Sequence, residues 1–328
     1  MRGLSWLLGF VATCQLACWA QAADMGSLDS TEPLRVGLLR DGNFPFSQPA
    51  QTSVPANHAG LEGFEVDLMD ALCEAAEINC TAVPLATLDE RISGVANGTL
   101  DFTISALSYT PGREAVVHFI RPFYYESGVA LFGSDQAGLD LFGPDAPTQQ
   151  ALEAASGWGG LFTGSFLAGQ TLCAVEGYYA LPFILKDIPN LNVRVLPTLQ
   201  EASDTVRGGG CAAFMYDSVT PVSEVALQVL NAPPAYESPY GVGISLEDKG
   251  SELEQRLVYA MTGLMNQGNS SRILELEQQW LVPNGIGPSS ALQDVVTAIS
   301  TFGSQPSGPG ESQVPQSYSL FGTRQTGR

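Results

Sequence analysis

The segment from Ser105 to Arg113 places polar groups directly after an apolar run. Ser108 supplies a hydroxyl, and Arg113 follows a Pro-Gly turn at the start of a predicted short helix. A planar guanidinium can donate two parallel hydrogen bonds to a carboxylate, and free carbonyls at a strand end add acceptors. These residue types fit a site for a carboxylate. The competing interpretation is a solvated surface arginine, which is the commoner place for this residue type.

Polar loops follow apolar runs at four places in the chain. They cover residues 40–46, 105–113, 176–179 and 217–218. In open α/β sheets, small ligands bind beyond the carboxyl ends of the strands. We therefore expect these loops to line a cleft between two sheets.

Strands and helices alternate in two successive units. In the first unit we expect strands at 34–39, 80–84 and 100–107 and helices at 64–76 and 88–97. In the second we expect strands at 171–175, 192–196 and 211–216 and helices at 180–187 and 199–208. A further strand is expected at 240–245, and helical structure at 253–280 with a break near Gly268. Residues 133–169, rich in Gly, Ala and Asp, are interpreted as an insertion or surface loop. The pattern predicts parallel α/β sheets.

The charge of the chain limits its partners. Its 328 residues carry 14 basic and 34 acidic side chains, a net charge of −20, and 45% are hydrophobic. A surface this negative repels phosphate backbones and anionic lipid, so binding to nucleic acid is disfavoured. The length suggests two domains.

Both ends of the chain differ from the middle. Residues 1–22 are typical of a cleaved signal peptide, with Arg2, an apolar stretch and a small-x-small site at Ala20-Gln21-Ala22. A lipid anchor at Cys18 is disfavoured because Gln15 stands where an aliphatic residue is needed. Residues 283–328 are rich in Gly, Pro, Ser and Gln and are predicted to be mostly disordered, with one helix possible at 291–302. No membrane-spanning helix is expected in the mature chain.

Four cysteines remain after the signal: Cys73, Cys80, Cys173 and Cys211. An even number in an exported chain fits two disulfides, and locality favours Cys73 with Cys80 and Cys173 with Cys211. Buried free thiols are the alternative. A zinc site is disfavoured because no CxxC spacing occurs and only two histidines are present.

Four ordered motifs carry a resemblance to a known family. They are Gly63-Phe64-Glu65-Val66-Asp67-Leu68, Gly98-Thr99-Leu100-Asp101, the segment Ser108 to Arg113, and Pro122-Phe123-Tyr124-Tyr125-Glu126-Ser127-Gly128. Together they resemble family 3 of the bacterial extracellular solute-binding proteins, the polar amino-acid receptors of the periplasm, over about residues 34–280. Both cysteine pairs are similar to pairs found in members of this family.

The resemblance implies a type II periplasmic-binding-protein fold, with two α/β lobes, two hinge crossovers and an interlobe ligand cleft. Residues 33–129 and 237–282 would form one lobe and residues 130–236 the other. The protein would be a monomeric periplasmic receptor that closes on an amino acid and delivers it to the membrane subunits of an ABC importer. Neither a cofactor nor a metal is implied.

The resemblance also suggests roles for individual residues. Arg113 would hold the α-carboxylate of the ligand, and Asp217 its α-ammonium group. Ser108 and the backbone of Ala106 would assist. A fixed cation and a fixed anion on opposite lobes recognise a zwitterion only when the cleft is shut.

Three positions depart from the family pattern. The loop of the second lobe is Glu176-Gly177-Tyr178-Tyr179, which keeps the glycine but replaces hydroxyl-bearing residues with aromatics. Leu88 stands where the family often has an aromatic wall, a role that Phe44 or Tyr178 would take over. Arg40 precedes Pro45 by five residues, as an arginine does in glutamate and aspartate binders. In the pocket it would favour an acidic or amide side chain; the alternative is a surface ion pair with Asp41.

An enzyme on the same fold is the rival function. Relatives that resemble periplasmic cyclohexadienyl dehydratases eliminate water and CO₂ from a ring, which needs a general acid or base. Glu176 is the obvious candidate, because His58 and His118 lie in segments interpreted as a surface loop and a strand flank. We expect a receptor without catalytic residues.

Overall fold

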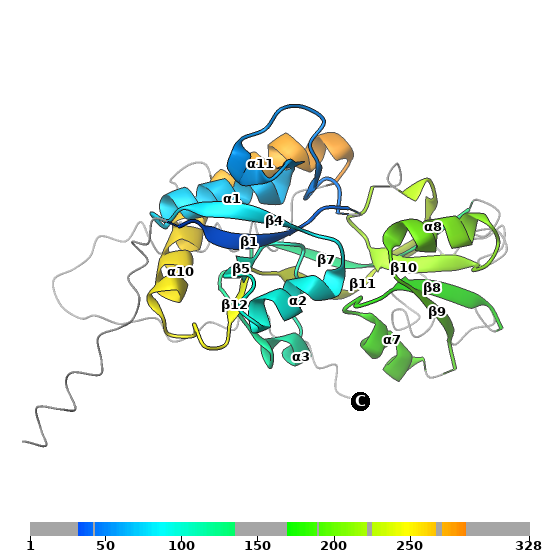
Figure 1. Ribbon diagram of the computed structural model, residues 1–328. Helices are drawn as coiled ribbons and strands as arrows, with labels where there is room; N and C mark the ends of the chain where they lie inside the picture. The colour runs from blue at the N-terminus through cyan, green and yellow to red at the C-terminus, as the bar shows by residue number, and fades with distance from the viewer. Residues whose placement is uncertain are drawn as a thin grey trace, which may run out of the picture.

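The computed structural model describes residues 32–41, 43–134, 169–188, 190–221, 225–266 and 271–286. In this part of the chain, most strands belong to two five-stranded mixed sheets, each covered by helices (Figure 1). The expected class of two α/β units is therefore confirmed. We call the sheet that contains the first strand, with its helices, the first lobe, and the other sheet with its helices the second lobe.

The sheet of the first lobe is built around the first apolar run of the chain. Its strand order is β4-β1-β5-β12-β6. The bounds are β1 (Leu34–Leu39), β4 (Cys80–Leu85), β5 (Phe102–Thr103), β6 (Val117–Phe119) and β12 (Gly243–Ser245). Strand β1 pairs in parallel with β4 and β5, whereas β12 pairs antiparallel with β5 and β6. Since β1 has a neighbour on both sides and helices on both faces, its residues are apolar almost throughout.

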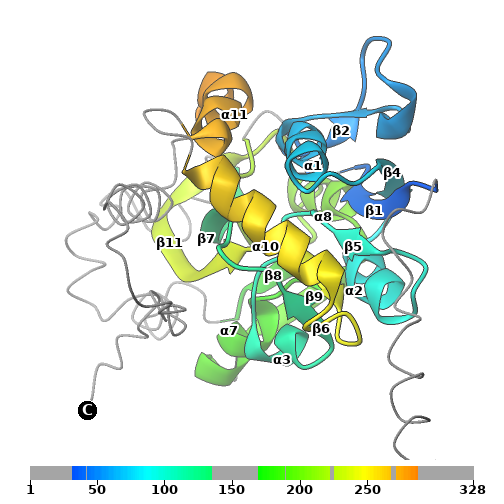
Figure 2. The same ribbon diagram turned by 90° about the vertical axis from the view of Figure 1, so that its left-hand side faces the viewer.

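Helices cover both faces of this sheet. On one face α1 (Phe64–Ala75), α10 (Glu252–Met265) and α11 (Arg272–Trp280) pack together, and Figure 2 shows α10 running across that side of the lobe. On the other face lies α2 (Leu88–Ala96), which begins at a capping box formed by Thr87 and Glu90. Smaller elements complete the lobe: β2 (Gln48–Pro49), β3 (Leu61–Glu62), α3 (Pro111–Glu114), η1 (Ala56–His58) and η2 (Val282–Asn284).

The second lobe has a sheet of order β11-β7-β10-β8-β9. The bounds are β7 (Tyr125–Gly133), β8 (Thr171–Val175), β9 (Asn192–Leu196), β10 (Ala213–Asp217) and β11 (Gln228–Tyr240), with helices α7 (Leu181–Asp187) and α8 (Leu199–Arg207). Strands β8, β9 and β10 are parallel, so their carboxyl ends share one edge of the sheet. That edge carries the polar residues discussed below.

Two adjacent strands connect the lobes. Strands β7 and β11 are antiparallel neighbours (Figure 1), and Tyr125 pairs with Tyr240. Both tyrosines pack into the core of the first lobe, whereas Val129, four residues further along β7, packs into the core of the second. The chain therefore passes from one core to the other within these two strands.

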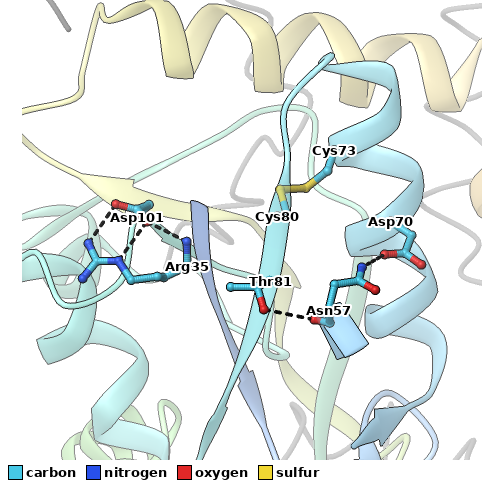
Figure 3. Close-up of a disulfide and its surroundings, with 7 residues drawn as sticks. All are labelled: Arg35, Asn57, Asp70, Cys73, Cys80, Thr81 and Asp101. Atoms are coloured by element: carbon cyan, nitrogen blue, oxygen red, sulfur yellow. Dashed lines mark hydrogen bonds and ion pairs between the residues drawn. A yellow bond between two sulfur atoms is a disulfide. The ribbon is translucent and has the colours of Figure 1, made fainter. Parts of the chain in front are cut away.

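Both predicted disulfides are present. Cys73 is bonded to Cys80, which ties the end of α1 to the start of β4 (Figure 3), and Cys173 is bonded to Cys211 beside the second sheet. In the same view Arg35 on β1 pairs with Asp101 before β5, with 2.9 Å between Nη2 and Oδ1. The first lobe is thus fastened on both sides of β1.

One sequence prediction needs correction. Residues 100–107 do not form one strand: only Phe102–Thr103 is paired as β5, because the backbone turns at Ala106, where φ is +45°. Of the tail predicted to be mostly disordered, only residues 283–286 are described: they include the end of η2, and Ile286 is buried against the first core. The signal peptide, residues 135–168 of the predicted insertion, and residues 287–328 lie outside the described residues.

No helix in the described part of the chain is both long and apolar enough to span a membrane.

Candidate functional site

A small hollow lies where the polar strand ends of the two lobes meet. Its free space is on the order of that taken by one water molecule. The lining residues are Leu88, Arg91, Ala106, Ser108, Arg113, Tyr178, Tyr179, Tyr216 and Asp217. The first five belong to the first lobe and the last four to the second. The lobes are therefore in contact here, and a larger ligand needs them to separate.

Arg113 joins the two lobes directly. Thr110 caps α3 by accepting a hydrogen bond from the backbone N–H of Arg113, which fixes where the side chain starts. Its Nη1 donates to the carbonyl of Ser108 at 2.8 Å, and its Nη2 donates to the carbonyl of Gly177 at 2.9 Å. Burial and the neighbouring Arg91 lower the pKa of Arg113, yet a guanidinium stays charged at neutral pH.

Arg91 is a second buried cation in the hollow. It lies on α2 and is 2% exposed. Its Nε and Nη1 donate to backbone carbonyls, at 2.8 Å to Leu88 and 3.0 Å to Ala106, and Nη1 also reaches the carbonyl of Ser105. Its Nη2 has no hydrogen-bond partner among the residues that the structure describes. The sequence analysis did not select this residue. The available signal was a charged side chain on the same helix face as Leu88, Ile92 and Val95, which indicates a buried charge.

Asp217 is the carboxylate of the hollow. It ends β10, and its Oδ2 accepts a hydrogen bond from the Tyr240 hydroxyl at 2.7 Å. The Tyr178 hydroxyl donates to its Oδ1 at 3.3 Å. Burial raises the pKa of Asp217 to about 6, against the opposing effects of Tyr240, Arg91, Tyr178 and Arg113. Two cations and one anion thus line the same space.

Three tyrosines form an aromatic wall on the second lobe. The rings of Tyr178 and Tyr216 are stacked with centroids 5.3 Å apart, and Tyr179 packs edge-on against Tyr178 at 5.1 Å. The Tyr179 hydroxyl donates to the carbonyl of Tyr236 at 2.7 Å. Of the two residues expected to replace the missing aromatic wall, Tyr178 lines this hollow and Phe44 does not; the role of Tyr178 toward a ligand stays a prediction. Leu88, which stands in the usual aromatic position, lies across the hollow.

The backbone at Ala106 is held by a buried acid. Its N–H donates to Glu65 Oε1, as the Tyr124 hydroxyl also does. Burial raises the pKa of Glu65 to about 7, and the hydrogen bonds from Tyr124, Ala106 and Asn43 oppose this. The carbonyl of Ala106 accepts from Arg91. Ser108 is buried and lines the hollow, with its carbonyl used by Arg113.

Gly177 brings the two lobes close together. Its φ is +73°, a conformation that favours glycine, and a Cβ there would lie 2.4 Å from Oδ1 of Asp89. Asp89 is on α2 of the first lobe. No larger residue fits between the lobes in this arrangement, which explains why the loop keeps a glycine while its neighbours are aromatic.

Several candidate residues lie elsewhere. Of the two interpretations of Arg40, the structure shows the surface ion pair: the side chain is 55% exposed, pairs with Asp41 at 2.7 Å and is not among the residues that line the hollow. β1 ends at Leu39, and Arg40 points to solvent beyond it. Phe44 lines a second small hollow on the other side of Asp217, together with Asn43, Phe46, Val219, Thr220 and Tyr240.

The candidate acid–base groups of the enzyme alternative are also displaced. Glu176 is exposed and does not line either hollow. His58 is buried rather than in a surface loop and pairs with Asp70 at 2.6 Å, and His118 is buried on β6 and pairs with Glu254 at 2.7 Å. Among the described residues, no three His, Cys, Asp or Glu side chains form a cluster suited to a metal.

The match to a protein family covers more of this chain than the matches to the individual relatives reported below. Residues 41–282 match the profile of bacterial extracellular solute-binding proteins, family 3. The ABC transporter arginine-binding protein 1 of Escherichia coli K12 is 33% identical over 87 residues, which are 26% of this chain and 35% of that protein. Amino-acid-binding protein AabA of Dichelobacter nodosus is 24% identical over 129 residues, 38% of this chain and 46% of that protein.

Each of these matched segments spans less than half of the relative's own length. Both relatives are named as binding proteins rather than enzymes. Among solved structures, an ancestral amino acid-binding protein described as a precursor of cyclohexadienyl dehydratase superposes with a TM-score of 0.58 at 20% identity, covering 76% of this chain and 95% of that one. At this identity the match concerns the fold, which is that of two-lobed binding proteins.

Proposed function

Because the chain belongs to family 3 of the bacterial extracellular solute-binding proteins, we propose that it is a receptor that captures one amino acid between its two lobes. One observation carries the proposal: Arg113 of the first lobe and Asp217 of the second line the same hollow. Arg113 holds the α-carboxylate of the ligand, and Asp217 holds its α-ammonium group. A zwitterion then satisfies both buried charges at once.

Closure of the lobes forms the site. Without ligand, Arg113 donates to the Gly177 carbonyl, so a protein acceptor takes one of the bonds that a carboxylate would take. The free space is too small for an amino acid. The lobes open by bending in β7 and β11, admit the ligand and close again. Ser108 and Gly177 then lie beside the carboxylate, with Tyr178 against the ligand.

Arg91 determines which side chain is preferred. A second guanidinium beside Arg113 leaves the hollow with one positive charge more than Asp217 balances. An acidic side chain removes that excess, and an amide side chain offers an oxygen acceptor. A lysine or arginine side chain is repelled. Arg91 therefore takes the part that Arg40 would have had in the pocket, even though one relative is named for arginine.

The remaining parts of the proposal concern the setting of the receptor. Residues 1–22 direct the chain to the periplasm as a signal peptide, which is then cleaved. The mature protein acts as a monomer. It delivers its ligand to the membrane subunits of an ABC importer. Residues 33–129 with 237–282 move as one body and residues 130–236 as the other. The passage of β7 and β11 from one core to the other supports these boundaries.

A thermal-shift panel tests the proposal. A ligand that binds only the folded state raises the apparent stability by RT ln(1 + [L]/Kd). The full chain is screened against the twenty amino acids, small dicarboxylates and prephenate. We expect stabilisation by glutamate, aspartate or their amides. Stabilisation by none of the amino acids contradicts the proposal, and turnover of prephenate replaces it with the dehydratase.

A further inference from the structure

Tyr216 differs from the other buried tyrosines near the hollow. It is 7% exposed and lines the hollow beside Asp217. The hydroxyls of Tyr178, Tyr179 and Tyr240 each donate to an acceptor. The Tyr216 hydroxyl has no hydrogen-bond partner among the described residues. This oxygen is not among the fully buried atoms that lack a partner, so it keeps access to the hollow, where a ligand or a water can bond to it.

The hydroxyl of Tyr216 is available as a donor. Burial and the nearby Asp217 raise the pKa of Tyr216, so it is protonated at neutral pH. Its ring is fixed by the stacking of Tyr178, with 5.3 Å between centroids. The charged groups near it are Arg91, Arg113 and Asp217. Because the ring is held in place by stacking, the hydroxyl donor of Tyr216 has a fixed position.

A second free donor lines the same hollow. The Nη2 group of Arg91 has no partner among the described residues, while Nε and Nη1 are held by the carbonyls of Leu88, Ser105 and Ala106. These bonds fix the plane of the guanidinium. Arg91 and Tyr216 approach the hollow from opposite lobes, since both line it.

We propose that Tyr216 is a specificity-determining residue, whose hydroxyl donates to a second carboxylate of the ligand that also accepts from Nη2 of Arg91. The inference rests on the proposed function, because Arg113 and Asp217 are taken by the α-carboxylate and the α-ammonium group. Two donors facing one space suit the two oxygens of a carboxylate. The ligand class is therefore amino acids with a carboxylate in the side chain.

Calorimetric titration of the full chain tests this contact. Glutamate, aspartate, glutamine and norvaline are titrated into the unaltered chain, Tyr216→Phe and Tyr259→Phe. Phenylalanine keeps the ring and its stacking but removes the donor. Tyr259 is the matched control, because it is 78% exposed on α10, on the far side of the first lobe from the hollow.

We expect Tyr216→Phe to weaken the better acidic ligand by about 10- to 100-fold, which is typical of one hydrogen bond to a charged group. Norvaline, which has no side-chain acceptor, changes less than about twofold, and Tyr259→Phe changes neither ligand. Equal losses for both ligands, or no loss for the acidic one, overturn the proposal. Circular dichroism and thermal unfolding show whether Tyr216→Phe is folded.

The unaltered chain gives an independent readout. If it binds the acidic amino acid no more tightly than norvaline, the role of Tyr216 is overturned even where the variant does not fold. If it binds amino acids but prefers arginine, this inference fails while the receptor function stands. If it binds no amino acid, both fail.

Discussion

Three buried charged groups line the hollow. Arg91 and Arg113 are cationic, Asp217 is the one carboxylate among the described residues that line the hollow, and all three are largely buried. Removing the partner of a buried charge is costly, so each group is strongly biased toward a ligand that pairs with it. An amino acid supplies both opposite charges, because its α-ammonium and α-carboxylate groups are bonded to the same Cα. The residue-scale predictions follow from which charge each ligand group meets.

Asp217→Asn separates the ammonium contact from the rest. The amide keeps the shape but removes the negative charge that holds the ammonium group. We expect glutamate to bind about 100-fold more weakly to this variant, since a charge-assisted bond is lost and a buried cation is left unpaired. Glutarate, which lacks the ammonium group, should bind with nearly unchanged affinity. Calorimetry with both ligands checks this, and equal losses would refute the role of Asp217.

The pH dependence of binding has a definite sign. The pKa of Asp217 in the ligand-free chain is about 6, raised by burial. Only the ionised carboxylate holds an ammonium group, so the affinity falls as the pH drops below 6. Because only about a tenth of Asp217 is ionised one pH unit below its pKa, we expect binding to be about tenfold weaker at pH 5 than at pH 7.5. The guanidiniums of Arg91 and Arg113 and the hydroxyls of Tyr178 and Tyr240 do not titrate in this range.

Asp217→Asn is the control for this titration. It removes the proton that Asp217 takes up and leaves Glu65, whose pKa is about 7, in place. A variant with the same pH dependence as the unaltered chain would show that Asp217 is not the titrating group.

At the scale of elements, ends of strands and helices bring the charges together. β10 ends at Asp217, α3 starts two residues before Arg113, and α2 carries Arg91 in its first turn. Thr87 and Thr110 set the two helix starts through their caps. The loop after β8 supplies Gly177. Each element contributes one group, which is why loss of one helix start would displace a single ligand contact.

Sequence reasoning found most of these elements and part of the site. Periodicity located β1, α1 and β8, because their apolar residues face one continuous core. Arg91 was missed because helical periodicity indicates which face of α2 carries it, but not whether that face borders a cleft. For Arg40 the pocket and an ion pair with Asp41 stayed open, because spacing alone cannot show that its side chain leaves the strand end toward solvent. The turn at Ala106 was invisible, since alanine rarely adopts a positive φ.

Gly177→Ala tests the close contact between the lobes. Its Cβ would lie 2.4 Å from Asp89 Oδ1, a clash that opening the lobes relieves. We expect ligand affinity to fall at least tenfold and the ligand-bound radius of gyration, measured by small-angle X-ray scattering, to rise. Gly250→Ala is the matched control, because φ is +83° there and nothing lies within 4 Å. If both variants weaken binding equally, backbone strain rather than lobe contact is responsible.

The two disulfides should differ in their effect on stability. Cys173 and Cys211 close a loop with a sequence separation of 38, against 7 for Cys73 and Cys80. Loop-closure entropy predicts losses of about 4 and about 2 kcal/mol when each pair is replaced by alanine. Urea unfolding followed by tryptophan fluorescence measures the difference. A larger loss for the Cys73–Cys80 pair would contradict the entropic account.

At the scale of the whole molecule, the site exists only where two bodies meet. β7 and β11 carry the chain between the cores, and Arg113 reaches the second lobe through the Gly177 carbonyl. Neither lobe alone presents both a guanidinium and Asp217 to a ligand. Closure excludes water, which strengthens the charge pairs that form. The net negative charge of the chain therefore does not indicate the charge of the ligand, whereas the buried Arg91 and Arg113 favour a ligand with carboxylate groups.

Calorimetric titration of the unaltered chain and Arg113→Ala with the best amino acid from the screen tests the central claim most directly. Arg272→Ala is the control, since that arginine is partly exposed on α11, does not line the hollow and pairs only with Glu275 among the described residues. We predict one ligand per chain for the unaltered protein and for Arg272→Ala, and a loss of about 100-fold or more for Arg113→Ala with its fold intact. Unchanged affinity in Arg113→Ala would contradict the account.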